Sequence, residues 1–443
     1  MGTYFPSTVK ERQEMLESMG YAQIEDLYSS VPGKVLLNRT LNLPEGLSEI
    51  EVKRKMGNIA GKNRVFSKIF RGAGAYNHYI PSAVKYITSK EEFVTAYTPY
   101  QAEISQGILQ STFEYQTMIC ELTGMEVSNA SVYDGATAAA EAIVMCKDKK
   151  RRKAIISETT NPQVIQTIQT YCKWLGMEIV ILPSKEGTTD LNLLKATVDE
   201  ETACVYIQQP NYFGQIEEAG TIAEITHSVE AKYIMGCNPI SLAILKTPAE
   251  YGADIAVGEG QPLGMPLSFG GPFLGFMATT EKLMRKLPGR IVGETKDING
   301  KRAYVLTLQA REQHIRRESA SSNICSNQAL CALTAAIYLS TMGKEGLKQV
   351  AVQSMSKAHY LAEQLTKIKG FELIYKGDFF HEFVTICPKE VDSVMKRLEA
   401  EGFLGGYPLK GVNEGNILWC VTEMNTKEEM DQLVTILREV ALS

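Results

Sequence analysis

The middle of the chain alternates short apolar runs with stretches in which apolar residues recur at helical spacing. The apolar runs predict strands at residues 154–157, 179–182, 204–207 and 233–234. The stretches between them predict helices that begin near residues 134–137 and cover residues 163–175, 191–198 and 221–230. This alternation is typical of a mostly parallel sheet with helices on both faces. Ligands bind such sheets at the carboxyl ends of the strands, so we expect a site in the loops there.

A loop dense in glycine and proline interrupts this rhythm at residues 251–276. Apolar runs at residues 253–257 and 274–278 predict two strands that flank it. Between them lie Gly258, Gly260, Pro262, Gly264, Pro266 and the turn Gly270-Gly271-Pro272. Proline holds such a loop in one shape and glycine lets another surface come close. We therefore expect this loop to shape the site.

The two ends of the chain follow different patterns. Residues 1–65 predict only helical pieces, one capped by Ser7-Thr8 and another begun by Ser48, with little apolar surface. The segment after residue 287 predicts a loop, and a long helix then runs to about Met342. Residues 345–443 predict helices at 347–368, 391–401 and 427–441 and strands at 371–375, 382–386 and 417–421. We expect an N-terminal helical arm (1–65) lying on another surface, a large domain (66–322) and a small C-terminal domain (323–443).

The composition narrows the class of protein. The chain has 443 residues, of which 44% are hydrophobic and 22% charged, as in ordinary globular proteins. A net charge of −5 argues against a general nucleic-acid binder, and we interpret the basic run at residues 147–153 as a solvated linker. The N-terminus lacks the features of a signal peptide, and no apolar run is long enough to span a membrane. Nine cysteines without a CxxC pair predict reduced thiols in a cytoplasmic protein.

Two loops rich in tyrosine, amide and carboxyl groups precede a predicted helix at residues 108–122, which is expected to end at Gly124. They cover residues 71–84 and 97–107. Tyrosine has an apolar body and a polar tip, so it suits sites and interfaces with one dry side. Packing of tyrosines at loop corners explains the same composition equally well.

Five separated segments resemble one known family, the glycine decarboxylase P-protein. They are residues 71–84, 97–107, 129–141, 257–276 and 311–326. The similarity covers nearly all of the chain and is greatest to the N-terminal half of the family, which many bacteria make as a separate subunit 1. The resemblance implies an α/β fold: a fold-type I transferase (aspartate aminotransferase-like) large domain with a mostly parallel sheet, plus a small α/β C-terminal domain. Proteins of this fold use pyridoxal 5′-phosphate (PLP).

The resemblance also implies that the cofactor site of this chain is degenerate. Such a site needs a lysine for the aldimine, a carboxylate on the ring nitrogen and a ring stacked on the cofactor. Motif matching puts Gln261, Met235 and Thr137 at these positions. Asp134 is placed to cap the helix whose N-terminus would receive the phosphate, where its carboxylate would compete for the same N–H donors. We expect no cofactor bound covalently to this chain.

Other sites have less support in the residues. PLP binding through Lys246 or Lys282 stays open, although neither lies in the glycine-rich loop. The glycines from Gly258 to Gly264 miss the dinucleotide spacing, the five histidines show no metal-ligand spacing, and GxSxG does not occur. No metal site is expected.

The resemblance finally implies partners and a reaction. The chain would pair with a PLP-bearing P-protein subunit 2, as a heterotetramer of two of each, to decarboxylate glycine and pass the aminomethyl group to the lipoyl H-protein. Ten residues are expected to complete the partner's site: Tyr76, Asn77, His78, Tyr79, Tyr97, Tyr100, Gln101, Glu103, Arg311 and His314. Two alternatives stay open, a self-sufficient PLP enzyme acting on another amino acid and a non-catalytic regulatory paralogue.

Overall fold

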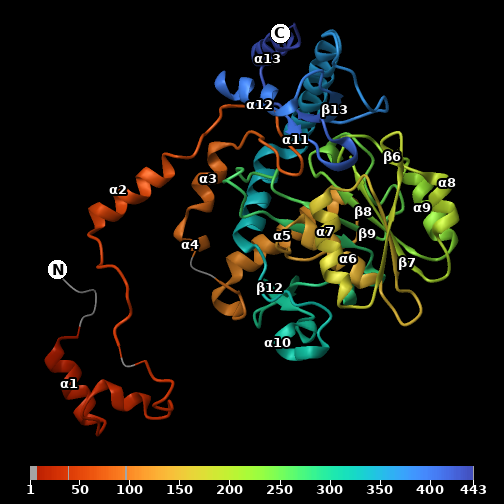
Figure 1. Ribbon diagram of the computed structural model, residues 1–443. Coiled ribbons are helices and arrows are strands. Elements are labelled where there is room, and N and C mark those ends of the chain that lie inside the picture. Colours follow the sequence, from red (N-terminus) through yellow and green to blue (C-terminus); the bar gives the residue numbers. More distant parts are fainter. Residues whose placement is uncertain (1–6, 38, 95–96, 443) are drawn as a thin grey trace. The chain divides into compact units, whose positions relative to one another are not determined.

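The computed structural model describes residues 7–37, 39–94 and 97–442 (Figure 1). Residues 1–6, which belong to the N-terminus where no signal peptide is predicted, lie outside the described residues. By its internal contacts the chain divides into Met1–Val65 and Phe66–Ser443. The predicted boundary between residues 322 and 323 stays a prediction.

The described residues of the first unit form two α-helices, α1 (Val9–Ser18) and α2 (Glu49–Ala60), and a 3-10 helix, η1 (Ile24–Tyr28). Thr8 and Ser48 cap the two α-helices, each in a reciprocal pair of hydrogen bonds with a glutamate three residues later. Both predicted helix starts are thus confirmed.

A seven-stranded sheet organises the second unit. In spatial order its strands are β2 (Val127–Ser128), β10 (Gly275–Thr279), β9 (Ile255–Glu259), β8 (Lys232–Cys237), β7 (Thr202–Gln209), β3 (Lys153–Ser157) and β4 (Glu178–Leu182). The five strands from β9 to β4 run parallel, and β10 is antiparallel to both of its neighbours. The mostly parallel sheet is confirmed.

Helices cover both faces of this sheet (Figure 1). One face packs against α6 (Gly135–Cys146) and α7 (Pro162–Lys173). The other packs against α8 (Leu191–Thr197) and α9 (Ala219–Ser228) over β3, β7 and β8, and against α5 (Gln106–Thr123) and α11 (Ala329–Thr366) over β9 and β10. Residues 147–152 of the basic run connect α6 to β3, whereas Lys153 is the buried first residue of β3 and not part of a solvated linker. Gly124 ends α5 with a φ of 72°, and Gly343 interrupts α11 with a φ of 60°.

The loop predicted after residue 287 is wrong. The chain forms a hairpin there, β11 (Ile291–Lys296) and β12 (Arg302–Thr307), with a turn at Gly300. Val292, Tyr304 and Leu306 of the hairpin are buried in a cluster with Leu109 of α5. This packing joins distant parts of the chain, as the two hydrogen bonds between Gln116 and Val292, 176 positions apart, show.

The C-terminal part holds a three-stranded sheet, β13 (Glu382–Ile386), β16 (Asn416–Cys420) and β15 (Tyr407–Pro408), packed against α11, α12 (Val391–Ala400) and α13 (Lys427–Leu442). The strand predicted at residues 371–375 is wrong, because that segment forms only an isolated bridge, from Leu373 to Thr385. The nine cysteines are free thiols. None of the described helices combines the length and apolarity of a membrane span.

Candidate functional site

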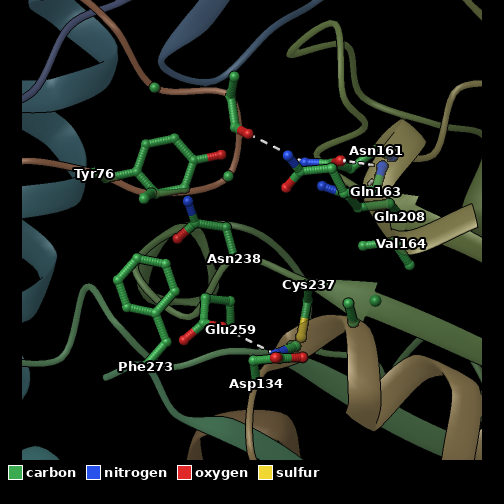
Figure 2. A pocket seen from close by; sticks show the side chains of 18 of the residues that line it. Tyr76, Asp134, Asn161, Gln163, Val164, Gln208, Cys237, Asn238, Glu259 and Phe273 are labelled. Atoms are coloured by element: carbon green, nitrogen blue, oxygen red, sulfur yellow. Dashed lines mark hydrogen bonds between the residues drawn. The ribbon is translucent and has the colours of Figure 1, made fainter. Parts of the chain in front are cut away.

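A cavity of about 370 Å³ opens at the carboxyl ends of β7, β8 and β9, on the face covered by α6 and α7 (Figure 2). The strand ends contribute Tyr206, Gln208, Gly236, Cys237, Asn238, Gly258 and Glu259. The starts of α6 and α7 add Asp134 and Asn161, and the loop before α3 (Ser82–Thr88) adds Tyr76. This is the place where a parallel sheet of this kind binds its ligands.

Two carboxylates occupy the N-terminus of α6, at the base of the cavity. Asp134 Oδ1 accepts a hydrogen bond from the Thr137 N–H at 2.7 Å, so the predicted cap is confirmed. Glu259 Oε2 accepts from the Gly135 N–H at 2.9 Å. The other Glu259 oxygen accepts from the N–H groups of Gln261 and Leu274, both at 2.9 Å. Two of the first-turn N–H groups that could hold an anion, those of Gly135 and Thr137, are therefore already bonded to side chains of this chain.

Glu259 was missed by the sequence reasoning. It lies two residues before Gln261 and two residues after the predicted strand at 253–257, and this position was the only available signal. Burial raises the pKa of Glu259 to about 7, and the charge of Asp134 acts in the same direction. The three backbone N–H donors oppose that shift because they favour the charged carboxylate.

Gln261 joins two loops and does not line the cavity. Its side chain is only 1% exposed. Its Nε2 donates to the carbonyls of Tyr76 and Met265, at 2.9 and 2.7 Å, and its Oε1 accepts from the Tyr76 N–H at 2.8 Å. Every polar atom of the amide is thus used to hold the loop that carries Tyr76 against the glycine-rich loop.

Met235 and Thr137, like Gln261, do not line the cavity. Met235 is buried on the opposite face of the sheet, among residues that pack under α8 and α9. The residues after it, Gly236, Cys237 and Asn238, are those that line the cavity. Thr137 is buried beside Tyr171. Of the four matched positions, Asp134 alone is among the lining residues in the described part of the chain.

The residues present do not fit PLP. The Gln261 amide cannot form an imine, and its atoms are bonded elsewhere. The lining set within the described residues contains no lysine, arginine or histidine, and Lys246 and Lys282 are outside it. Two carboxylates at the α6 N-terminus would repel a phosphate. Among the described residues, no cluster of three or more potential ligands could hold a metal ion.

The first group of predicted site residues ties the Tyr76 loop to the C-terminal part of the chain. The Tyr76 hydroxyl donates to Glu382 Oε2 at 2.8 Å. Thr422 Oγ1 donates to the Asn77 carbonyl at 2.7 Å. Glu423 bonds His78 Nδ1 and the Tyr79 N–H, each at 2.7 Å. Tyr76 lines the cavity, Asn77 and His78 hold the loop in place, and the Tyr79 ring is exposed.

The second group gathers around Arg290, a residue that the sequence reasoning missed because the hairpin was predicted as a loop. Arg290 is 5% exposed, and its Nη2 donates to the Tyr100 hydroxyl at 2.9 Å. Glu312, also missed, lies 4.0 Å from Arg290 Nη2 and 3.4 Å from His314 Nδ1. The His314 ring packs edge-on against Tyr100, with ring centroids 6.0 Å apart.

The remaining predicted residues lie at the rim of this group or in solvent. Arg311 donates to the carbonyls of Leu308 and Gly289, both at 3.1 Å. The Tyr97 ring is 84% exposed, and its hydroxyl lies 3.0 Å from Ser326 Oγ. Gln101 and Glu103 are exposed. Of the ten predicted residues, four (Tyr76, Asn77, His78 and Tyr79) thus belong to the loop beside the cavity, and Tyr100 and His314 gather around Arg290.

Comparisons with a family profile, with related sequences and with solved structures identify one family. The sequence profile described as glycine cleavage system P-protein matches residues 2–437. A Moorella thermoacetica protein described as probable glycine dehydrogenase (decarboxylating) subunit 1 is 51% identical over 442 residues, covering 99% of each chain. A relative in Carboxydothermus hydrogenoformans with the same description is 50% identical, covering 98% of this chain and 99% of the relative.

Solved structures agree. An inhibitor-bound glycine decarboxylase (P-protein) has a TM-score of 0.93 and 41% identity, and the match covers 99% of this chain and 100% of that one. A sphingosine-1-phosphate lyase of Burkholderia pseudomallei has a TM-score of 0.67 at 14% identity over 94% of both chains, a likeness of fold alone. The chain belongs to the glycine cleavage system P-protein family.

Proposed function

We propose that this chain is subunit 1 of a two-subunit glycine decarboxylase, glycine dehydrogenase (aminomethyl-transferring), and that its partner, P-protein subunit 2, carries the PLP. The two subunits form a cytoplasmic heterotetramer that contains two copies of each. This complex decarboxylates glycine, releases CO2 and transfers the aminomethyl group to the lipoyl arm of the H-protein. The relatives described as subunit 1 match this chain over almost their whole length, which supports the assignment.

The observation that carries the proposal is the chemistry at the α6 N-terminus. The carboxylates of Asp134 and Glu259 accept the N–H groups there, and Gln261 uses both ends of its amide on backbone groups. A chain of this family that cannot hold the cofactor contributes to catalysis only through a neighbour that does.

The group around Arg290 supports a contribution to the partner's site. Tyr97 and Tyr100 are 84% and 50% exposed, so another chain can contact both side chains. The buried Arg290 guanidinium packs over the Tyr100 ring and donates to its hydroxyl, which leaves that hydroxyl's own proton for a further acceptor. Once a partner chain covers the Tyr100 ring, its oriented hydroxyl suits a site where charge develops away from water. We infer that Tyr97, Tyr100, Arg311 and His314 face the partner's glycine site.

The first unit supports an extensive interface. Its helices expose apolar side chains on more than one face. Among its described residues, Leu16 is the only apolar side chain that is buried. The exposed set includes Met15, Met19, Ile24, Leu27, Ile50, Val52, Met56 and Ile59. Apolar surface of this extent is typical of obligate partners, and we propose that the unit lies on subunit 2.

The test uses the full chain, subunit 2 and added PLP. The chain alone with PLP is expected to show no aldimine absorbance and no glycine–CO2 exchange. Subunit 2 with PLP is expected to gain exchange activity only when this chain is added. An aldimine band and exchange activity in this chain alone would identify a self-sufficient enzyme. Full activity of subunit 2 by itself would identify this chain as a regulatory paralogue.

A further inference from the structure

The cavity at the strand ends contains polar groups without a protein partner. Tyr206 is 3% exposed, and among the described residues none forms a hydrogen bond with its hydroxyl. The Asn238 amide nitrogen is buried without an acceptor. Figure 2 shows Asn238 between Tyr76 and Glu259, inside the cavity. Buried polar groups are normally hydrogen bonded, so the Asn238 nitrogen indicates a bound polar molecule. The Tyr206 hydroxyl in the same cavity offers that molecule a second partner.

The shape of the cavity leaves room for the Tyr206 hydroxyl. A Cβ atom at Gly236 would lie 2.3 Å from the Tyr206 hydroxyl, so a side chain there would displace it. The rings of Tyr76 and Phe273 form apolar walls. The volume of about 370 Å³ is within the range of roughly 300–1,000 Å³ found for small-molecule sites.

The charge of the cavity is opposite to that of a phosphate site. Asp134 and Glu259 are the charged side chains that line it within the described residues. The Glu259 carboxylate already accepts the N–H group of Gly135, so the helix N-terminus has no donor left at that position for an anion. A cation near these two carboxylates would relieve their mutual repulsion.

We propose that this cavity is a second ligand site, which binds a small primary amine that carries hydrogen-bonding oxygen substituents and no phosphate. The ammonium group of the ligand lies toward Asp134 and Glu259, and its oxygens face the Asn238 amide and the Tyr206 hydroxyl. The ring walls of Tyr76 and Phe273 favour a flat body. The site belongs to this chain alone and does not depend on the partner or on the glycine reaction.

Two compounds that differ only in phosphate test the proposal. Pyridoxamine and pyridoxamine 5′-phosphate have the same ring, hydroxyl and aminomethyl group. In calorimetric titrations of the full chain, pyridoxamine is expected to bind at least ~10-fold more tightly, because the carboxylates repel the phosphate. Asp134→Asn keeps a helix cap and removes one charge, so it should reduce this preference by about 10-fold.

Two further variants complete the design. Tyr206→Phe should weaken pyridoxamine binding several-fold, because it removes the free hydroxyl. Asp190→Asn is the matched control, since Asp190 caps α8 through the N–H groups of Asn192 and Leu193 and is not among the cavity residues. It should leave both affinities unchanged, and thermal melts should show that every variant is folded.

Three outcomes would overturn the proposal. They are the absence of pyridoxamine binding to the folded chain, equal or tighter binding of the phosphate compound, and unchanged affinities in both Asp134→Asn and Tyr206→Phe. None of these readouts involves glycine decarboxylation. Tighter binding of the phosphate compound would also contradict the phosphate-free α6 N-terminus on which the proposed function rests, whereas the other two outcomes leave that function standing. The exchange assay with subunit 2 tests the proposed function separately.

Discussion

Gln261 and Tyr76 are joined by two hydrogen bonds, from the Tyr76 N–H to Gln261 Oε1 at 2.8 Å and from Gln261 Nε2 to the Tyr76 carbonyl at 2.9 Å. Because the amide holds two loops together, we expect Gln261→Lys to create no PLP site. Lysine cannot accept the Tyr76 N–H, and Asp134 and Glu259 would still occupy the α6 N-terminus. Absorbance after PLP addition checks this, and a stable aldimine band would contradict it. The variant should also lose about 1–3 kcal/mol of unfolding free energy, measured with urea.

The Tyr100 hydroxyl is expected to act in the partner's reaction. Tyr100→Phe should lower the rate of glycine–CO2 exchange by about 10²–10³, if the hydroxyl donates to developing charge, without weakening the complex. Exchange rates measured across subunit 2 concentrations test this. The matched control is Tyr86→Phe, an exposed tyrosine whose hydroxyl accepts from Lys90 and lies outside the group. Recovery of the wild-type rate at saturating subunit 2 would leave Tyr100 as an interface residue.

His78 is expected to stabilise the fold. Glu423→Ala removes the acceptor of His78 Nδ1 and of the Tyr79 N–H. Leaving these groups without an acceptor should lower the free energy of unfolding by about 2–5 kcal/mol in urea titrations. Glu401→Ala, which breaks an exposed pair with Arg397, should change it by less than about 1 kcal/mol. Equal stabilities of the two variants would contradict the structural role.

Glu382 is expected to make stability depend on pH. Burial raises its pKa from 4.5 to about 7, so the folded state holds the proton more tightly than the unfolded state. Its stabilising contribution is complete below pH 4.5 and is lost as the pH rises through about 7.

Glu382→Gln does not titrate. The free energy of unfolding of this variant should therefore fall less between about pH 5 and pH 8 than that of the wild type. The difference between the two decreases should be roughly 1–3 kcal/mol in urea titrations. Glu363→Gln is the control, because Glu363 is an exposed partner of Lys367. Equal changes of unfolding free energy with pH in Glu382→Gln and the wild type would exclude this effect.

Association of this chain with subunit 2 is expected to depend on a row of exposed apolar side chains on α2. Val52, Met56 and Ile59 recur at helical spacing and are exposed. Met56→Glu should raise the dissociation constant for subunit 2 at least ~10-fold, because burying such a side chain contributes about 1.5–3 kcal/mol. Lys55→Gln changes the charge equally on the same helix and should have little effect. Sedimentation checks both, and unaltered association of Met56→Glu would remove α2 from the interface.

Features that depend on neighbouring residues in the chain were predictable from the sequence. Thr8, Ser48 and Asp134 cap helices through N–H groups within three residues, so their role follows from local order. The strands β3, β7 and β8 contain the predicted apolar runs because both of their faces are buried. The P-protein family was likewise recognisable, since its motifs are contiguous segments.

Only the tertiary structure decided where distant segments meet. The hairpin of β11 and β12 buries its apolar face on α5, and Arg290 reaches Tyr100 across 190 positions. The pleat of β8 turns Met235 away from the cavity, a direction that motif matching does not contain. Glu259 takes one donor from the neighbouring residue 261, but its other two come from residues 135 and 274, which adjoin it only after the sheet has formed. Capping depends on local backbone order, whereas the charge of a site depends on which distant groups the sheet brings together.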